Sequence, residues 1–247
     1  MTARTLLVVL AHPDDESFSI GGTLARSVAE GKYVHLVVST RGEAGIPGKD
    51  AAETAVIRED ELRRACAELG IQELSMLGFE DGRLAAVHKD LAIARVLSIM
   101  RQFRPDVVIT FGPDGISGHP DHIAVHHWTT AAFDLYQQET DFGQRLYYIA
   151  PSEATQQGCG VPPAAKTVGG PVAFIDVEPY LVQKVQAAQQ HQSQNPPFSG
   201  DPETDAHNMT GLELFRLVRP QLSANGSMPE DDLFTAFSGS KHQQEYS

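Results

Sequence analysis

Short apolar runs alternate with segments of helical periodicity through the first 150 residues. The runs are nearly continuous in hydrophobic residues, as expected of strands in a sheet that is covered on both faces. They lie at 5–10, 33–40, 73–77, 106–111 and 145–150. The intervening segments predict helices over 18–30, 51–69, 89–103 and from 119 or 120 to about 136. This alternation predicts an α/β fold with a Rossmann-like, doubly wound and mostly parallel sheet.

The expected topology brings two distant loops together. In the common strand order 3-2-1-4-5, the runs at 5–10 and 106–111 are neighbours, and the chain reverses direction between them. Ligands of such sheets bind in the crevice outside the strand ends at that switch point. Side chains that follow these two runs are therefore expected to face one another.

The remaining residues are less regular. We expect a long loop at 151–171, a strand at 172–177, a helix at 180–192, a loop at 195–205 and a short apolar element at 212–218. Loops as long as the first are usually lids or binding loops. We expect 1–247 to form a single α/β domain, with 1–150 as its Rossmann-like core and 151–247 as an irregular C-terminal elaboration that covers the site.

Composition narrows the class of protein. The net charge of −13 over 247 residues is against nucleic-acid or anionic-membrane binding. No apolar run approaches the roughly 20 residues of a membrane span, and the N-terminus lacks a signal-peptide pattern. Cys66 and Cys159 are the only cysteines. They are expected to be free thiols in a reducing compartment, which predicts a cytoplasmic protein.

The two loops at the expected switch point carry metal-ligand residue types. Leu10-Ala11-His12-Pro13-Asp14-Asp15-Glu16 follows the first run, and Gly118-His119-Pro120-Asp121-His122 follows the fourth. Two histidines and one carboxylate, with a fourth position left for water, form the ligand set of catalytic zinc sites. The same set also holds ferrous iron, so zinc is favoured but not unique. Taken singly, a histidine is more often a packing or surface residue, and a cap on the next helix is the less favoured alternative for Asp14.

Six segments resemble the LmbE-like family of zinc-dependent de-N-acetylases, also called the PIG-L family. The two segments above are the specific ones. Thr40–Gly45 and Arg58–Leu62 support them, Gln189–Gln194 is similar to a later H-x-S-Q segment, and 231–234 is like a family tail. Some members that act on inositol-linked sugars carry a tyrosine just before G-H-P-D-H, where this chain has Ser117, so a tyrosine-assisted mechanism does not transfer.

The resemblance implies a role for each matching residue. It implies that the zinc ligands are His12, Asp15 and His122 and that the general base is Asp14. His119, in its protonated form, is implied as the electrophilic partner that stabilises the oxyanion. Substrate-binding positions are implied at Arg41, Glu43, Arg58, Asp81 and His191. Read from the residues alone, the stretch at Arg58 is a solvated helix face with i,i+4 ion pairs, and Asp81-Gly82 is an ordinary turn.

The leading hypothesis is a zinc-dependent amidohydrolase that removes acetyl from a small-molecule N-acetylglucosamine-type conjugate. An amidase of a larger thiol conjugate on the same fold is the first alternative, with residues 151–171 and the tail setting the width of the site. A non-catalytic metal protein is disfavoured because such sites usually have four protein ligands. A nucleotide-binding protein is disfavoured because the chain has neither G-x-G-x-x-G after the first run nor a Walker-type loop. Homo-oligomerisation is left open.

Overall fold

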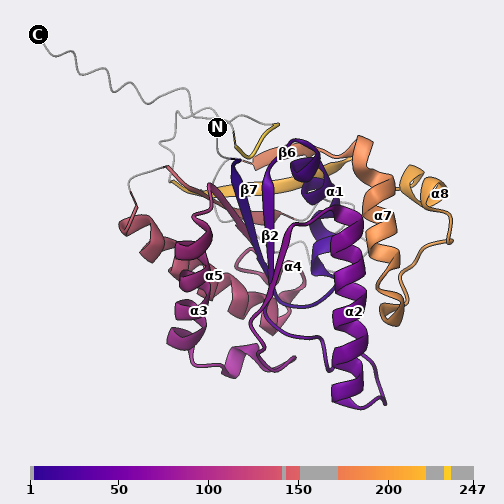
Figure 1. The fold of residues 1–247 in the computed structure, drawn as a ribbon, viewed down its shortest axis with the longest axis horizontal. Helices are drawn as coiled ribbons and strands as arrows, with labels where there is room; N and C mark the ends of the chain where they lie inside the picture. The colour runs from indigo at the N-terminus through magenta and orange to yellow at the C-terminus, as the bar shows by residue number, and fades with distance from the viewer. Residues whose placement is uncertain (1–2, 141–142, 151–171, 221–230, 235–247) are drawn as a thin grey trace, which may run out of the picture.

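The computed structural model describes residues 3–140, 143–150, 172–220 and 231–234. Its strands form one sheet in the order β3-β2-β1-β4-β5-β7-β6 (Figure 1). The strands are β1 (Thr5–Leu10), β2 (Tyr33–Val38), β3 (Glu73–Met76), β4 (Val107–Thr110), β5 (Arg145–Ala150), β6 (Val172–Asp176) and β7 (Leu212–Arg219). The first five pair in parallel, which confirms the predicted doubly wound topology and places β1 beside β4.

The C-terminal part of the chain extends the same sheet. The element expected at 212–218 is β7, which inserts antiparallel between β5 and β6. An antiparallel edge on an otherwise parallel sheet is common in doubly wound folds. The loop expected at 151–171, with Cys159, lies outside the described residues, as does most of the tail.

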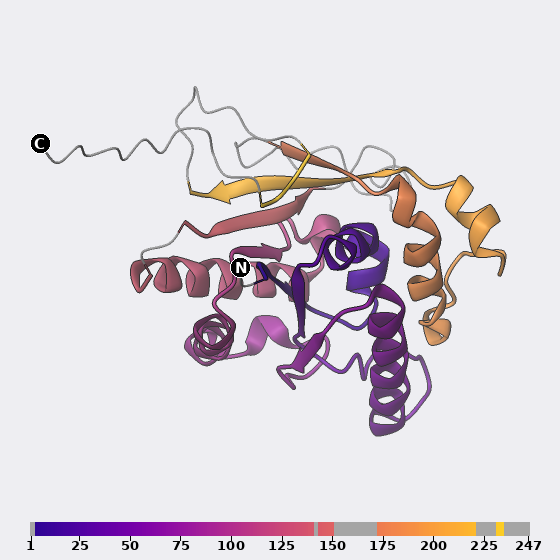
Figure 2. The ribbon, with the colours of Figure 1, turned by 45° about the horizontal axis from the view of Figure 1, so that its top comes forward.

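Helices cover both faces of the sheet. On one face lie α1 (Asp15–Ala29), α2 (Ala51–Leu69) and α7 (Leu181–Gln189), and on the other α3 (Lys89–Phe103) and α5 (Pro120–Gln138) (Figures 1 and 2). The short helices are η1 (Leu84–Ala86), α4 (Gly115–Gly118), η2 (Glu178–Tyr180), η3 (Gln192–Gln194) and α8 (Pro202–His207). Because both faces are covered, the residues from Leu6 to Ala11 are completely buried. Among the described helices, none combines the length and apolarity needed to cross a bilayer.

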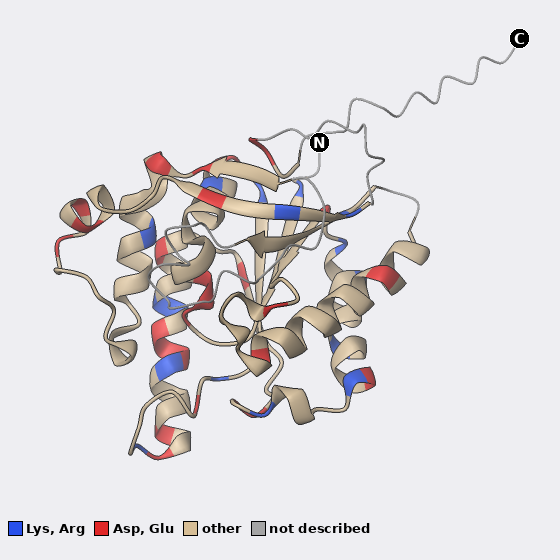
Figure 3. Cartoon of the chain, turned by 180° about the vertical axis from the view of Figure 1, so that it is seen from behind, with Lys and Arg blue, Asp and Glu red and all other residues tan. Residues whose placement is uncertain are grey.

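Helix α2 has one buried face and one charged face. Acidic and basic residues alternate along its ribbon (Figure 3). Glu59 pairs with Arg63 at 2.7 Å, and Asp60 pairs with Arg64. These are the i,i+4 pairs expected from the sequence, and exposed pairs of this kind add only about 0.3–0.5 kcal/mol each. The helix is held mainly by its inner face, where Leu62 is fully buried.

Three predicted segments differ from the structure for local reasons. Helix α1 begins at Asp15 rather than at residue 18, because the charged residues of the loop already form its first turn. The helix expected over 180–192 is divided into η2, α7 and η3. The second break occurs at His191, whose backbone leaves the helical region (φ −80°, ψ 53°). The loop expected over 195–205 contains the start of α8, with Pro202 in its first turn.

Candidate metal centre

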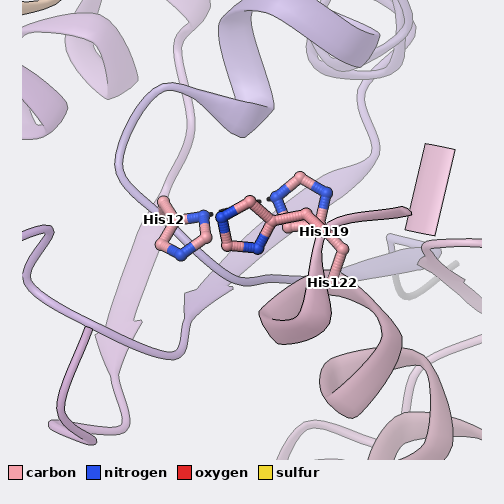
Figure 4. Close-up of side chains that lie close together, drawn as sticks. All are labelled: His12, His119 and His122. Atoms are coloured by element: carbon pink, nitrogen blue, oxygen red, sulfur yellow. Dashed lines mark hydrogen bonds between the residues drawn. The ribbon is translucent and has the colours of Figure 1, made fainter. Parts of the chain in front are cut away.

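The ends of β1 and β4 bring the two predicted motif loops together at the switch point. His12 lies in the loop after β1, and His119 and His122 lie at the start of α5 (Figure 4). Their rings point toward one another from these two separate segments. Pro120 opens α5 and His119 caps it by accepting from the Asp121 backbone N–H, so the local sequence fixes where the helix begins.

Three of the predicted ligand atoms converge. His122 Nε2 lies 3.3 Å from His12 Nδ1 and 3.3 Å from Asp15 Oδ1. His12 Nδ1 and Asp15 Oδ2 are 3.7 Å apart. Atoms bound to one tetrahedral zinc ion at about 2.0–2.1 Å lie roughly 3.3 Å from each other. With a different oxygen of Asp15 close to each ring, His12, Asp15 and His122 form a candidate site for a single ion.

The outer hydrogen bonds of the two rings leave lone pairs facing this centre. His12 Nε2 lies 3.2 Å from Asp121 Oδ2 and 3.1 Å from Asp81 Oδ1, and carboxylates only accept. His122 Nδ1 donates to the carbonyl oxygen of Gly115 at 3.1 Å. In the neutral form of each ring, the single proton lies on the outer nitrogen, so Nδ1 of His12 and Nε2 of His122 present lone pairs. Two lone pairs and a carboxylate oxygen meeting at one point suit a cation.

Other groupings of metal-ligand atoms also occur within the described residues. One replaces Asp15 with His119, and another joins His12 to Asp81 and Asp121. The two carboxylates of the second grouping already accept a hydrogen bond from His12 Nε2. They are therefore better explained as groups that orient His12 than as ligands of a separate metal site.

Asp121 is a buried carboxylate to which the sequence patterns assigned no role. It is 1% exposed and, besides facing His12, accepts from the backbone N–H groups of Gly82 at 2.8 Å and Leu84 at 3.0 Å. A carboxylate behind a ligating histidine fixes its tautomer and ring orientation. The sequence feature that could have indicated this role is the position of Asp121 between His119 and His122 in the same motif.

The two histidines beside Asp15 keep its carboxylate ionised. Burial raises the pKa of its carboxyl, but His122 and His12 outweigh burial and lower the pKa to about 2. Burial likewise lowers the pKa of His12, yet the hydrogen bonds to Asp121 and Asp81 raise it to about 10 in the metal-free protein. A proton then occupies the position that a cation would take, so metal binding displaces a proton there.

Asp14 stands beside the ligand atoms in an unusual backbone conformation. Its φ of 114° lies in the left-handed region, which costs a residue other than glycine about 1–3 kcal/mol. Burial, together with the adjacent Asp15, raises the pKa of Asp14 to about 7, although Arg58 opposes this rise. A base with a pKa near the working pH is the most effective proton acceptor.

Arg58 lies against Asp14 instead of facing solvent. It is 3% exposed, and its Nη2 donates to Asp14 Oδ2 at 2.8 Å and to the carbonyl oxygen of Pro13. A Cβ at Gly42 or Gly45 would crowd the guanidinium, so the glycines leave room for Arg58 in this position. The predicted exposed face does not extend to this residue, and its contact with a sugar stays a prediction.

His119 is exposed and differs from its predicted protonation state. Its Nδ1 accepts from the Asp121 N–H at 3.2 Å, which leaves the ring proton on Nε2. Burial, with the nearby His12 and His122, lowers its pKa. The structure therefore favours a neutral ring that donates through Nε2–H, in place of the protonated ring we expected.

Three of the remaining predicted substrate positions, Arg41, Glu43 and Asp81, lie in loops near His12, and the fourth is buried. Arg41 pairs with Glu59 at 2.8 Å and stays partly exposed. Glu43 accepts from the Asp81 N–H at 2.9 Å, and Asp81 accepts in turn from Ala44 N–H at 3.0 Å. These bonds hold the loops beside His12, while any contact of the three predicted residues with a substrate stays a prediction.

His191, by contrast, is fully buried. Its Nε2 lies 2.7 Å from Glu16 Oε1, and both side chains are 0% exposed. A fully buried ring is badly placed to meet a ligand arriving from solvent. The structure places it behind Asp14, and its predicted contact with substrate remains without support from this geometry.

Comparisons with known proteins agree with this architecture. The family model described as PIG-L, GlcNAc-PI de-N-acetylase, matches residues 7–133. A 1D-myo-inositol 2-acetamido-2-deoxy-alpha-D-glucopyranoside deacetylase from Acidothermus cellulolyticus is 32% identical over 94% of each chain. Other deacetylases of the same name match over about half of their length, 54% for the one from Rhodococcus jostii.

Solved structures show the same fold. The conserved protein TT1542 from Thermus thermophilus is 28% identical, with a TM-score of 0.64 over 90% of this chain and 98% of its own. The N,N'-diacetylchitobiose deacetylase from Pyrococcus horikoshii has a TM-score of 0.64 over 87% of this chain and 84% of its own. At 20% identity, the second likeness supports the fold alone.

Proposed function

Because the chain belongs to the PIG-L family of GlcNAc-PI de-N-acetylases, we propose that it is a zinc-dependent amidohydrolase that removes acetyl from an N-acetylglucosamine-type conjugate. The observation that carries the proposal is that His122 Nε2 lies 3.3 Å from both His12 Nδ1 and Asp15 Oδ1, with Asp14 next to Asp15 in the chain. Three protein ligands leave a vertex open, as catalytic zinc sites do. A 2-His, 1-carboxylate set also suits ferrous iron, and zinc is the proposal because amide hydrolysis needs no redox chemistry.

The chemistry divides between the ion and the chain. When bound, zinc polarises the amide carbonyl and makes hydroxide available near neutral pH. Asp14 accepts the proton of the attacking water and is the group placed to pass it to the leaving nitrogen. Its carboxylate is oriented by Arg58, which donates to Oδ2 and leaves the other oxygen for the water. His119 donates from neutral Nε2–H to the oxyanion, and such a donor contributes about 2.7–4 kcal/mol to lowering the barrier.

The proposed substrate is a small amino-sugar conjugate. The A. cellulolyticus relative is named for an N-acetylglucosaminyl-inositol, and its match covers 94% of this chain. Since Ser117 lies exposed before His119, the leaving nitrogen receives no help from a tyrosine at that position. An amidase of a larger thiol conjugate remains the alternative, and the residues expected to decide between them, 151–171, lie outside the described structure.

Release of primary amine tests the proposal directly. The zinc-loaded protein is incubated with N-acetylglucosamine, N-acetylglucosaminyl-inositol, N-acetylglucosaminyl-malate and a thiol-conjugated analogue, and amine is measured with fluorescamine. Turnover of an N-acetylated sugar supports the deacetylase, whereas turnover of the thiol conjugate alone supports the alternative. Asp14→Asn is the matched variant, and it should retain zinc while losing nearly all turnover. Loss of zinc in that variant would make Asp14 a ligand and overturn its assignment as base.

A further inference from the structure

A buried ion pair stands directly behind Asp14. Glu16 uses one carboxylate oxygen, Oε1, to face His191 Nε2 at 2.7 Å and to accept from Ser17 Oγ at 2.6 Å. The other oxygen, Oε2, accepts from the backbone N–H of Asp14 at 3.0 Å. His191 thus reaches the backbone of Asp14 through a single carboxylate, although it lies far away in the sequence.

The segment 191–193 also contacts helix α2, which carries Arg58, the partner of the Asp14 side chain. Ser193 donates to both oxygens of Glu61, from its backbone N–H at 2.7 Å and from its hydroxyl at 2.6 Å. Glu61 is buried on α2, one turn after Arg58. Arg58 is the residue that donates to the Asp14 carboxylate. Residues 191–193 are therefore fixed both to the partner of the Asp14 backbone and to the helix that carries the partner of its side chain.

We propose that His191 and Ser193 are positioning residues that hold Asp14 in its working orientation from the C-terminal part of the chain. The inference rests on the function proposed above, since it takes Asp14 as the proton acceptor. It replaces the predicted contact of His191 with substrate by an indirect action through Glu16.

The backbone of Asp14 explains why such a support is needed. Its positive φ is a conformation that persists only when surrounding contacts over-determine it. A catalytic group must also stay within about 0.5 Å of its productive position, and its support comes from neighbours that are themselves locked. Glu16 fixes the N–H of Asp14, and the carbonyl of Asp14 accepts from Ser17 N and Phe18 N, both at 3.1 Å.

Stability alone is a weaker explanation of the pair. Breaking a buried ion pair is destabilising, but its net contribution is small next to that of well-packed apolar residues. Within the described residues, Nδ1 of His191 is buried without a hydrogen-bond partner, which is a further cost of placing histidine there. The presence of histidine at this buried position is better explained by the orienting contact that its Nε2 makes with Glu16.

The chain contains a matched control for this pair. Glu213 on β7 is buried, accepts from the backbone N–H groups of Gly22 and Thr23 in α1, and pairs with Lys184 of α7 at 2.6 Å. Like Glu16, it joins α1 to the α7 region through one carboxylate. Unlike Glu16, it has no bond to Asp14. Changes at the two carboxylates should therefore affect stability alike and turnover differently.

Steady-state kinetics of the zinc-loaded enzyme test the inference, with Glu213→Gln as control. Misplacing a catalytic group by about 1 Å can cost roughly 10²-fold in rate. We expect His191→Gln to lower kcat about 30- to 100-fold, with KM within about threefold and zinc content unchanged. Glu213→Gln should lower the melting temperature while leaving kcat within about threefold, because its contacts do not reach Asp14. Ser193→Ala keeps the backbone donor and should lower kcat by about three- to tenfold, so it serves if His191→Gln does not fold.

A double-mutant cycle separates positioning from general damage. If His191 acts through Asp14, adding His191→Gln to Asp14→Asn should leave the residual rate unchanged. A full multiplicative loss in that background overturns the inference, as does a kcat close to wild type in both His191→Gln and Ser193→Ala. A wild-type enzyme that releases no amine from any of the sugars overturns the proposed function instead, and the inference with it.

Discussion

His12 Nε2 lies 3.2 Å from Asp121 Oδ2, although the two residues are 109 positions apart in the chain. Asp121 is itself held by the N–H groups of Gly82 and Leu84, so its orientation does not depend on a bound ion. The carboxylate sets the tautomer of His12 and turns the lone pair of Nδ1 toward His122 and Asp15. The proposed ligand His12 is therefore held from behind by a residue that is not itself one of the expected ligands.

Asp121→Asn tests this support. The amide keeps the size of the side chain but removes the charge, so His12 becomes a poorer ligand. We expect zinc affinity to fall about 10- to 100-fold, measured by competition with a chromophoric chelator. Asp134→Asn, on the same helix but paired with Arg219, is the control and should not change affinity. Equal affinity in the Asp121 variant would show that the carboxylate does not support the ligand.

Metal binding should stabilise the fold. A ligand that binds only the native state adds about 2.7 kcal/mol at a concentration 100 times its Kd. Chelation should accordingly lower the melting temperature of the wild type, and zinc should restore it. Asp15→Asn should remove most of the zinc-dependent shift. A variant that still gains the full shift would mean that Asp15 lies outside the coordination shell.

His119 should act on rate without holding the ion. His119→Ala is expected to retain zinc and to lower kcat by about 10²–10³-fold, as for loss of one oxyanion donor. Metal analysis after dialysis, together with kcat, checks both parts. Loss of zinc would instead favour the alternative grouping of His12, His119 and His122.

Arg58→Lys distinguishes positioning from substrate binding. Lysine keeps the charge but not the geometry that reaches Asp14 Oδ2 and Pro13 O together. If Arg58 orients the base, kcat should fall by at least about tenfold with little change in KM. A raised KM with unchanged kcat would favour the sugar contact implied by the family resemblance.

His35 should make stability depend on pH. Burial lowers its pKa to about 4, so the unfolded state, with the ordinary value near 6.5, binds more protons between these two pH values. Its contribution is present above about pH 6.5 and is lost as pH falls toward 4, by about 2–3 kcal/mol. Urea unfolding of wild type and His35→Gln at several pH values measures this, and the difference between the two curves should grow toward neutrality. Parallel curves would contradict a neutral buried His35.

Local sequence accounts for most of the fold. Apolar runs and helical periodicity predicted the five parallel strands and their order, because a strand covered on both faces must be apolar along its whole length. Prediction was weakest where tertiary contacts override periodicity. The helix expected over 180–192 ends early because His191 turns to meet Glu16, and β7 was seen only as an apolar element because its partners β5 and β6 are set by the sheet.

By itself, the sequence determined the chemistry available to this protein. It supplied the two motifs, the strand ends from which they project, and the family to which they belong, because each of these is written in contiguous residues. Only the tertiary structure decided how the buried polar residues pair: Asp121 behind His12, Arg58 on the carboxylate of Asp14, and His191 on Glu16. Such pairings follow from direction and distance across the folded core, where a buried charge must find a partner, and neither quantity is a local property of the chain.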